Sequence, residues 1–453
     1  MLRIFLLLIV LAAVWVGVVW LALPINLAAF DVPSLVSLHV APPVLVVFVW
    51  QACKRVWSWN AARQERIRAA EVAAKEEEER AAKAAAFEAE LTQRRAFIEC
   101  RAAWFATTAI PEWLMDESPQ RQSFKLDADA LRGGRREAAL SSSLQQVFEA
   151  ALSHCMSMAY LPFYLLHESD IGIARKVWQE LLPELPDSNP VTTPDFRCLP
   201  DSDDPLPDRL IALFESEPNI PALWLIGMDS LLENAPEPGI EPGHAVAAII
   251  VSRPNLTLSE VDTIEKPDES NQLIPHWERD YREGSALWER IPPALREEFL
   301  QIFPPFATLH RARTLSLQGD ENRIPRMERK FRGLIEPVLI DAALRDPPPI
   351  DEGEAKEPEP LDLGHLFHNC GPDSDRASVR RVMSILSALQ DFDCQTDKSN
   401  VLTEHGDTGA ASPVLMLAEA AACAAITQLP VMVAESGPED RVDIGIVRPT
   451  TRA

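Results

Sequence analysis

Near its carboxyl end the 453-residue chain contains the stretch that decides its fold: SPVLMLAEAAACAAIT (412–427), then PVMVAES (430–436) and DIGIVRP (443–449). The first segment predicts a helix, and the two short apolar segments after it predict strands. The same order of helix, strand and strand occurs earlier, between residues 208 and 252. Strands that alternate with helices indicate an α/β fold, with a mostly parallel sheet covered on both faces.

Helical periods also occur at 142–158, 174–182 and 379–389. Two acidic, proline-rich segments, 184–208 and 346–360, interrupt the patterned sequence and predict linkers. The chain holds 38 prolines and only 17 glycines. No GxGxxG, GxxxxGK[ST] or GxSxG motif occurs in it, so the commonest phosphate-binding loops and the hydrolase nucleophile turn are excluded.

The charge of the chain is strongly negative, with 43 Lys and Arg against 68 Asp and Glu and a net charge of −25. Nucleic-acid binding needs basic side chains gathered on one face, so this balance argues against a nucleic-acid partner. A hydrophobic content of 47% excludes a wholly disordered chain. Seven scattered cysteines without a CxxC pair indicate reduced thiols in the cytosol rather than a disulfide framework.

The amino-terminal region predicts a membrane hairpin, residues 4–53. Its first span, 4–22, is uncharged and long enough to cross the hydrocarbon core; a signal peptide is the alternative. A second apolar stretch, 34–53, ends among three tryptophans that mark a membrane interface. Basic residues precede the first span and follow the second, so the positive-inside rule places both ends in the cytoplasm.

The hairpin is followed by a segment of strong helix formers, residues 60–101, with nine basic and nine acidic side chains. Its apolar residues are too sparse for a sustained heptad, which favours a single charged helix over a coiled coil. Residues 1–59 carry three basic residues and one acidic residue, so the whole negative excess lies beyond residue 101.

These observations predict five regions. A transmembrane hairpin (1–58) and a charged helical linker (59–101) precede an α/β lobe (102–258), a mainly helical connecting region (259–345) and a second α/β lobe (346–453). A basic stretch at 310–333 predicts a solvated helix, with an anionic lipid leaflet or an acidic partner as the alternatives.

Two parts of the chain resemble the ends of the two halves of a thiolase or ketosynthase. They are ALWLIGMDSLL (222–232) with PGHAVAAIIVSRP (242–254), and HGDTGAASPVLMLAEAAACAA (405–425). The resemblance implies a two-lobed, thiolase-like body. Such enzymes acylate a cysteine thiolate and use histidines to polarise the thioester.

The positions that carry this chemistry depart from the family pattern. The histidine of the GxTGAA turn is replaced by Asp407, and His405 lies two residues earlier. The serines of SSSL (141–144) follow Leu140 rather than a cysteine. A carboxylate cannot donate to an oxyanion unless its pKa is strongly raised. We therefore predict no catalytic residue, no cofactor and no metal ligand, and expect the chain not to be an enzyme.

Other polar clusters are weaker candidates. HLFHNC (365–370) could present His365, His368 and Cys370 to a metal, but a short apolar strand is the favoured interpretation. The acidic runs DSDD (201–204) and DEGE (351–354) predict solvated loops. His154 and Cys155 predict ordinary helix packing. Four tryptophans could anchor either the core or a partner surface: Trp178, Trp224, Trp277 and Trp288.

The whole arrangement resembles the lipase adapter family of bacterial type VI secretion systems. It combines two amino-terminal spans, an Ala/Glu/Arg-rich helix and a divided body with the GMDSL and GDTGAAS signatures. The resemblance implies an adapter at the inner membrane that binds a phospholipase effector in the cytoplasm and loads it onto the secretion spike protein. The alternatives are a membrane-anchored thiolase-like acyltransferase and an immunity protein that sequesters the effector.

Overall fold

The computed structural model describes residues 2–22, 31–111, 118–132, 135–182, 194–233, 240–256, 293–318, 324–347, 363–389, 398–437 and 440–450. The chain divides into two units, Met1–Ala89 and Glu90–Ala453, which we describe separately. Several residues discussed above lie outside the described residues: Trp277, Trp288, Cys394 and residues 351–360, which include DEGE (351–354).

The first unit contains helix α1 (Leu2–Ala22) and most of helix α2 (Val32–Arg94). Helix α2 continues through Pro42 and Pro43. Pro42 has no N–H, so the carbonyl of Leu38, four residues earlier, lacks its helical donor. The indole Nε1 of Trp15 on α1 donates to that carbonyl at 2.8 Å. The two apolar helices are thus joined at the point where proline opens the backbone ladder.

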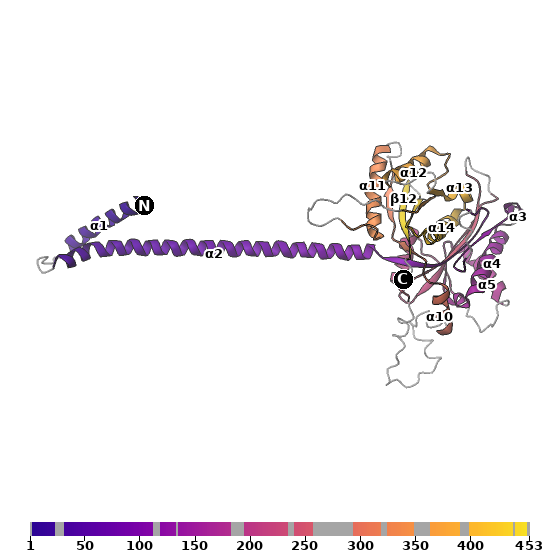
Figure 1. Ribbon diagram of the computed structural model, residues 1–453, viewed down its shortest axis with the longest axis horizontal. Helices are drawn as coiled ribbons and strands as arrows, with labels where there is room; N and C mark the ends of the chain where they lie inside the picture. The colour runs from indigo at the N-terminus through magenta and orange to yellow at the C-terminus, as the bar shows by residue number, and fades with distance from the viewer. Residues whose placement is uncertain are drawn as a thin grey trace, which may run out of the picture. The chain divides into compact units, whose positions relative to one another are not determined.

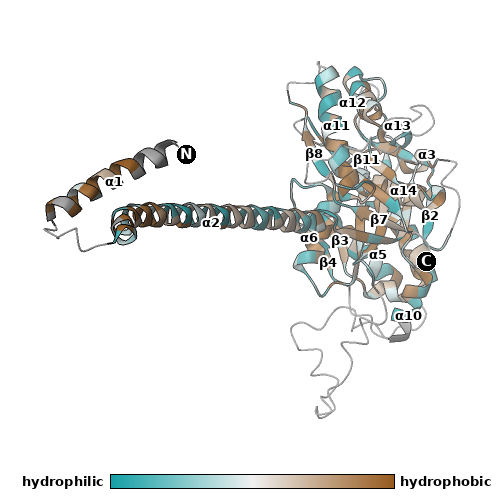
Figure 2. Cartoon of the chain, turned by 60° about the vertical axis from the view of Figure 1, so that its left-hand side comes forward, coloured by the Kyte–Doolittle hydropathy of each residue, from teal (hydrophilic) through white to brown (hydrophobic). Residues whose placement is uncertain are grey.

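Among the described residues, two helical segments are long and apolar enough to cross a membrane: α2 and Gly409–Thr427. The second belongs to the buried core of the body, so its apolar composition reflects protein packing. In α1 the described apolar run, Ile9–Val19, is shorter. Figure 2 shows apolar colouring on α1 and at the start of α2, with more hydrophilic residues along the rest of α2.

The predicted linker needs two corrections. The second apolar stretch and the charged segment form one helix rather than two elements. That helix ends at Arg94, and a buried strand begins at Phe97, so the helix predicted as far as residue 101 is wrong at its end. The first residues of this strand pair with residues 251–252 and 307–310, more than 150 positions further along the chain, and these distant pairings override the local helix propensity.

The body is built on a sheet of twelve strands. Their bounds are β1 (Phe97–Thr107), β2 (Arg121–Lys125), β3 (Phe163–Leu165), β4 (Phe196–Cys198), β5 (Ala222–Ser230), β6 (His244–Ser252), β7 (Ala307–His310), β8 (Arg313–Ser316), β9 (His365–His368), β10 (Lys398–Asn400), β11 (Val431–Gly437) and β12 (Arg441–Pro449).

The order of the strands is β10-β9-β11-β12-β7-β1-β6-β5-β3-β4, with β2 beside β1 and β8 beside β12. Two matching halves meet at the antiparallel pair β1–β7. Moving outward from β1, the pairings are antiparallel to β6 and β5, then parallel to β3 and β4. Moving outward from β7, the pairings to β12, β11, β9 and β10 follow the same sequence of directions. The two-lobed α/β prediction is confirmed.

The prediction of a mostly parallel sheet is wrong, because the central strands pair antiparallel. Strands β5 and β6, like β11 and β12, follow one another along the chain and pair antiparallel, an arrangement that needs no crossover helix. The region 259–345 also needs correction. Its described part contributes strands β7 and β8 to the sheet besides its helices, and β7 is one of the two strands at the junction.

The helices of the body are α3 (Ala128–Arg132), α4 (Arg136–His154), α5 (Glu168–Leu181), α6 (Leu206–Ser216), α10 (Pro293–Ile302), α11 (Ile324–Asp341), α12 (Arg376–Ala388), α13 (Val401–His405) and α14 (Ser412–Thr427). These helices pack on the sheet in layers, and three hydrophobic cores lie between the layers. One core joins α4, α5 and α10 to one half-sheet, and another joins α11 and α12 to the other. Between the half-sheets, the third core contains α6 and α14 (Figure 1).

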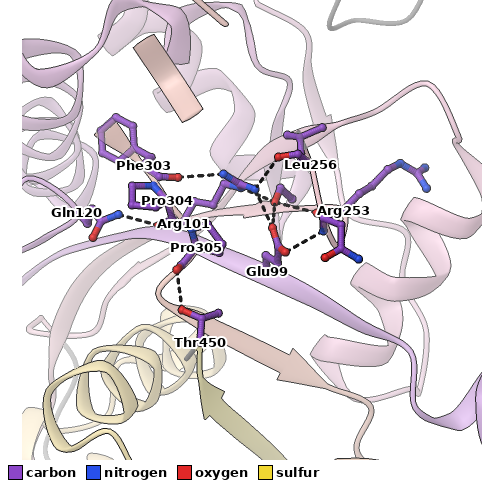
Figure 3. A network of polar contacts seen from close by, with 11 residues as sticks. Glu99, Arg101, Gln120, Arg253, Leu256, Phe303, Pro304, Pro305 and Thr450 are labelled. Atoms are coloured by element: carbon purple, nitrogen blue, oxygen red, sulfur yellow. Dashed lines mark hydrogen bonds and ion pairs between the residues drawn. The ribbon is translucent and has the colours of Figure 1, made fainter. Parts of the chain in front are cut away.

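A buried ion pair on β1 ties this junction together (Figure 3). The guanidinium of Arg101, 2% exposed, donates to Glu99 at 2.7 Å, to Ser252 Oγ of β6 at 2.6 Å and to the Phe303 carbonyl at 3.0 Å. Glu99 also accepts the backbone N–H of Asn255 at 2.8 Å. Apart from the Arg101–Glu99 contact within β1, these bonds hold β1 against segments distant in sequence, including the one that leads into β7.

We expect Arg101→Met to lower the free energy of unfolding by about 3–5 kcal/mol, because it leaves the Glu99 carboxylate buried without its cation. Chemical denaturation followed by circular dichroism measures the loss. The double variant Glu99→Gln/Arg101→Met should recover part of it. Arg197→Met is the matched control, since its pair with Asp195 is about half exposed and should contribute at most about 1 kcal/mol. A loss for Arg101→Met no larger than that of the control would contradict this role.

Candidate functional site

The GDTGAAS turn lies where the two halves of the body meet. Its backbone pairs with the segment before β6: the N–H of Asp407 donates to the Glu241 carbonyl at 2.7 Å, and that of Gly243 donates to the Asp407 carbonyl at 2.8 Å. Gly406 has φ +75°, and a Cβ there would lie 2.6 Å from the Glu241 oxygen. Only glycine allows this close approach of the two segments.

The two sequence signatures contact each other through Asp229, at the end of β5. One carboxylate oxygen of Asp229 accepts the N–H of Ala410 at 3.1 Å, within the GDTGAAS turn. The other accepts Arg136 of α4 at 2.8 Å. Asp407, the residue in the place of the family histidine, accepts the N–H of Gly409 through its side chain at 2.9 Å. Both carboxylates therefore accept hydrogen bonds that shape and fasten the turn.

His405 forms a buried pair with the one acidic residue of α14. Its Nε2 donates to Glu419 at 2.6 Å, and its Nδ1 lies 3.2 Å from Thr107 Oγ1 of β1. The side chains of His405 and Glu419 are both fully buried. Burial opposes the charged imidazole, but the Glu419 carboxylate outweighs this and raises the pKa of His405 above its ordinary value. The pair neutralises a carboxylate within the central core and links α13, α14 and β1.

His244, at the start of β6, is a second buried histidine at this junction. It lies 2.9 Å from Ser143 Oγ of α4, the third serine of the SSSL segment. Burial lowers the pKa of His244 to about 4, so its imidazole is neutral near pH 7. The serine also donates to the Ala139 carbonyl at 3.0 Å, as a helix serine commonly does.

The described cysteines of the body share one property: a thiol pKa above its ordinary value. Burial raises the pKa to about 12 for Cys100, Cys370 and Cys423, and raises it for Cys155 and Cys198 as well. A thiol attacks as its thiolate, so these five groups are poorly suited to acyl transfer at neutral pH.

The other residues considered as site candidates pack in the core or hydrogen-bond to neighbouring elements. HLFHNC forms strand β9 as predicted, with His365 Nε2 3.0 Å from Ser399 Oγ and Cys370 in the core. Across the described residues, no group of three or more His, Cys, Asp or Glu could hold a metal ion. His154 lies 3.1 Å from Gln122, consistent with packing. Trp178 and Trp224 belong to the core under α4 and α5.

A cleft of about 260 Å³ opens between elements of the two halves. One wall comes from the DSDD segment and the start of α6, and the other from the β11–β12 hairpin; its charged residues are Asp203, Asp204, Arg209, Glu435, Arg441 and Asp443. The guanidinium of Arg441 makes two 2.8 Å bonds to Asp443. Burial, with a smaller contribution from Asp443, raises the pKa of Glu435 to about 7.

Sequence reasoning treated DSDD only as a solvated loop, because the acidic residues opposite it lie more than 200 positions further along the chain. The cleft brings these two segments together. Its walls present carboxylates and guanidinium groups, without a described thiol among the lining residues. This arrangement is suited to holding a polar or charged group of a partner by ion pairs and hydrogen bonds.

Comparisons with known proteins find similarity only among solved structures. No protein-family model matches the chain, and no curated protein matches it. The chain is similar to the acyltransferase ChlB3, with 13% identity, 79% of this chain and 99% of that chain covered, and a TM-score of 0.40. It is also similar to the 3-oxoacyl-[acyl-carrier-protein] synthase III of Aquifex aeolicus VF5, with 10% identity, coverage of 78% and 99%, and a TM-score of 0.40.

Human mitochondrial 3-ketoacyl-CoA thiolase is a third match, with 9% identity, coverage of 79% and 100%, and a TM-score of 0.42. TM-scores below 0.5 carry no argument about the chemistry of this chain. Its two-lobed α/β architecture is established by the strand pairings and the three cores.

The lowered pKa of His244 predicts a loss of stability in acid. Its folded pKa is about 4, against 6.5 for the ordinary residue, so the unfolded chain binds the extra proton between these values. Stability from this group is complete above pH 6.5 and falls as the pH drops toward 4. Replacing it by His244→Gln should reduce the loss between pH 7.5 and pH 5 by about 2 kcal/mol, measured by urea denaturation at both pH values. An unchanged pH dependence would show that His244 is not the neutral, buried group described.

Proposed function

We propose that this chain is a non-catalytic binding protein: a membrane-anchored adapter whose α/β body captures a protein partner. One observation carries the proposal: all five described cysteines of the body have a thiol pKa above the ordinary value. The polar residues of the two signature segments support it, because Asp229 and His405 hydrogen-bond to other parts of the chain and Asp407 accepts a hydrogen bond from Gly409 within its own turn.

The charge of the chain favours a basic partner. The net charge is −25, and four of the carboxylates lie in the inter-half cleft beside Arg209 and Arg441, so the cleft itself has a small negative excess. A field of this sign raises the rate of encounter with a positively charged surface, and the short-range contacts of the cleft then add specificity. Electrostatic steering weakens with ionic strength, which makes the proposal testable.

The identity of the partner follows from the resemblance to the type VI secretion lipase adapters. On this proposal the partner is a phospholipase effector, which the adapter transfers to the secretion spike protein. The apolar helices α1 and α2 anchor the chain in the bacterial inner membrane, and the body lies in the cytoplasm. The apolar composition and length of α2 support the anchor.

An acyl-thioester probe separates the adapter from a thiolase-like acyltransferase. The full chain is incubated in mild detergent at pH 7.5 with an acyl-coenzyme A analogue and analysed by intact and peptide mass spectrometry. We expect no covalent adduct, because the described body thiols are protonated at this pH. Urea-unfolded chain treated with iodoacetamide is the control and should label at those cysteines. A stoichiometric acyl adduct on any cysteine, Cys394 included, would defeat the non-catalytic proposal.

Capture from native lysate tests the partner. The detergent-solubilised full chain should retain a phospholipase and a spike protein, and the retained amount should fall at least about tenfold between 50 mM and 500 mM salt. Asp203→Asn/Asp204→Asn, at the cleft, should weaken capture at low salt by about three- to tenfold. Glu137→Gln/Glu180→Gln is the matched control, since both residues are exposed on α4 and α5.

Two outcomes would count against the adapter, and a third would bear only on the cleft. Capture that is indifferent to salt would contradict electrostatic steering. A captured phospholipase that loses its activity on binding, with no spike protein present, would favour the immunity protein. Equal loss of capture in the cleft variant and the control variant would remove the cleft from the binding surface while leaving the adapter itself intact.

A further inference from the structure

Helices α11 and α12 form the outer layer of one half of the body. They pack against each other and over one face of the half-sheet, where Phe331, Val338 and Ile385 are among the residues of a shared core. Both helices cover the same face of the half-sheet and lie next to each other (Figure 1), so their solvent sides are neighbours on the outside of the body.

The solvent side of these helices combines basic and apolar residues. We call it the α11–α12 face and define it by Arg326, Arg329, Arg332, Arg376, Val379 and Met383. All six residues are exposed, and the apolar Val379 and Met383 are 42% and 49% exposed. Such a basic face is unusual on a chain with a net charge of −25.

Several acidic residues of the same helices are held in contacts within the protein. Asp341, at the end of α11, is buried and accepts Arg313 at 2.6 Å. Glu336 pairs with Arg345. Asp375 caps the amino terminus of α12 and accepts the N–H groups of Ala377 and Ser378. Glu328 of α11 is a further carboxylate on these helices, but the basic residues outnumber it, so the face keeps a positive local balance. The basic residues are Arg326, Arg329, Lys330, Arg332, Arg376 and Arg380.

The combination of arginine with exposed valine and methionine matches a lipid surface. A guanidinium group can bind a phosphate oxygen pair with two parallel hydrogen bonds. Val379 and Met383, exposed on α12 one and two turns after Arg376, can enter the boundary between headgroups and acyl chains, as in interfacial helices. An acidic protein would also bury apolar side chains at an interface; we favour lipid because the apolar helices of the same chain support anchoring in a membrane.

We propose that the α11–α12 face docks on the headgroups of anionic phospholipids. The inference rests on the membrane anchoring included in the proposed function, since a tether on the same chain raises the effective concentration of lipid. The rest of the acidic body is repelled by an anionic surface, so the contact selects one orientation of the body. Each basic residue close to such a surface strengthens binding by about fivefold.

The test uses the full chain reconstituted in lipid nanodiscs. One set of discs contains phosphatidylcholine alone, and the other contains phosphatidylcholine with 30% phosphatidylglycerol. Hydrogen–deuterium exchange is measured for peptides that cover 324–341 and 376–388. We expect exchange in these peptides to be at least threefold slower in the anionic discs, and the difference to vanish in 500 mM salt.

Variants assign the effect to the face. Arg326→Glu/Arg329→Glu/Arg332→Glu should abolish the difference between the two kinds of disc, with an unchanged circular dichroism spectrum. Arg175→Glu/Lys176→Glu, exposed on α5 over the other half-sheet, is the matched control and should retain it. Equal exchange of the unmodified chain in both discs, or protection that persists in the triple variant, would overturn the proposal. Protection that requires two chains per disc would assign the face to a second copy instead.

A separate measurement tests whether the chain is anchored in the membrane at all. Resistance of the chain to carbonate extraction from the vesicle membrane reports anchoring alone. If the chain is extracted, co-sedimentation with phosphatidylglycerol vesicles compares the unmodified chain with the triple variant. A preference of at least about tenfold for the unmodified chain would support the face without the anchor, and equal sedimentation would overturn it.

Discussion

The junction between β1 and β7 is the constraint on which the rest of the body depends. Each half-sheet has its own antiparallel pair of consecutive strands and its own outer helices, and among the described strands the sheet passes from one half to the other through β1 and β7. The buried pair of Glu99 and Arg101 lies at the same place and fastens β1 to β6 and to the segment before β7. A buried charge pair stabilises strongly only while both partners remain, which makes the junction sensitive to single substitutions.

The junction creates the environment of helix α14. Residues Val414–Ala424 are buried all around the helix, because half-sheets cover it on both sides. A helix surrounded in this way must be apolar on every face, and its one carboxylate, Glu419, needs a partner. His405 supplies that partner and Thr107 extends the contact to β1. Residues next to the GDTGAAS turn thus help to hold the two halves together.

Function, on our proposals, is divided between surfaces of opposite charge. The acidic inter-half cleft is suited to a basic partner, and the α11–α12 face is suited to anionic lipid. Neither proposed function uses a cysteine thiol, and burial raises the thiol pKa of Cys100, Cys370 and Cys423 to about 12. The same body can therefore present separate surfaces to a protein and to a membrane.

The sequence alone determined the α/β class, the repeated helix–strand–strand order and the bounds of α14, because these elements are set by local propensity and by the period of apolar residues. It also located the apolar amino-terminal stretches and the departures from the family pattern at Asp407. Tertiary structure alone decided that residues 97–101 are a strand, that β7 joins the halves and that DSDD faces Glu435 across a cleft. Each of these features depends on a partner more than 140 residues away. Pairing between such distant segments is not predicted by the periodicity or the propensity of nearby residues.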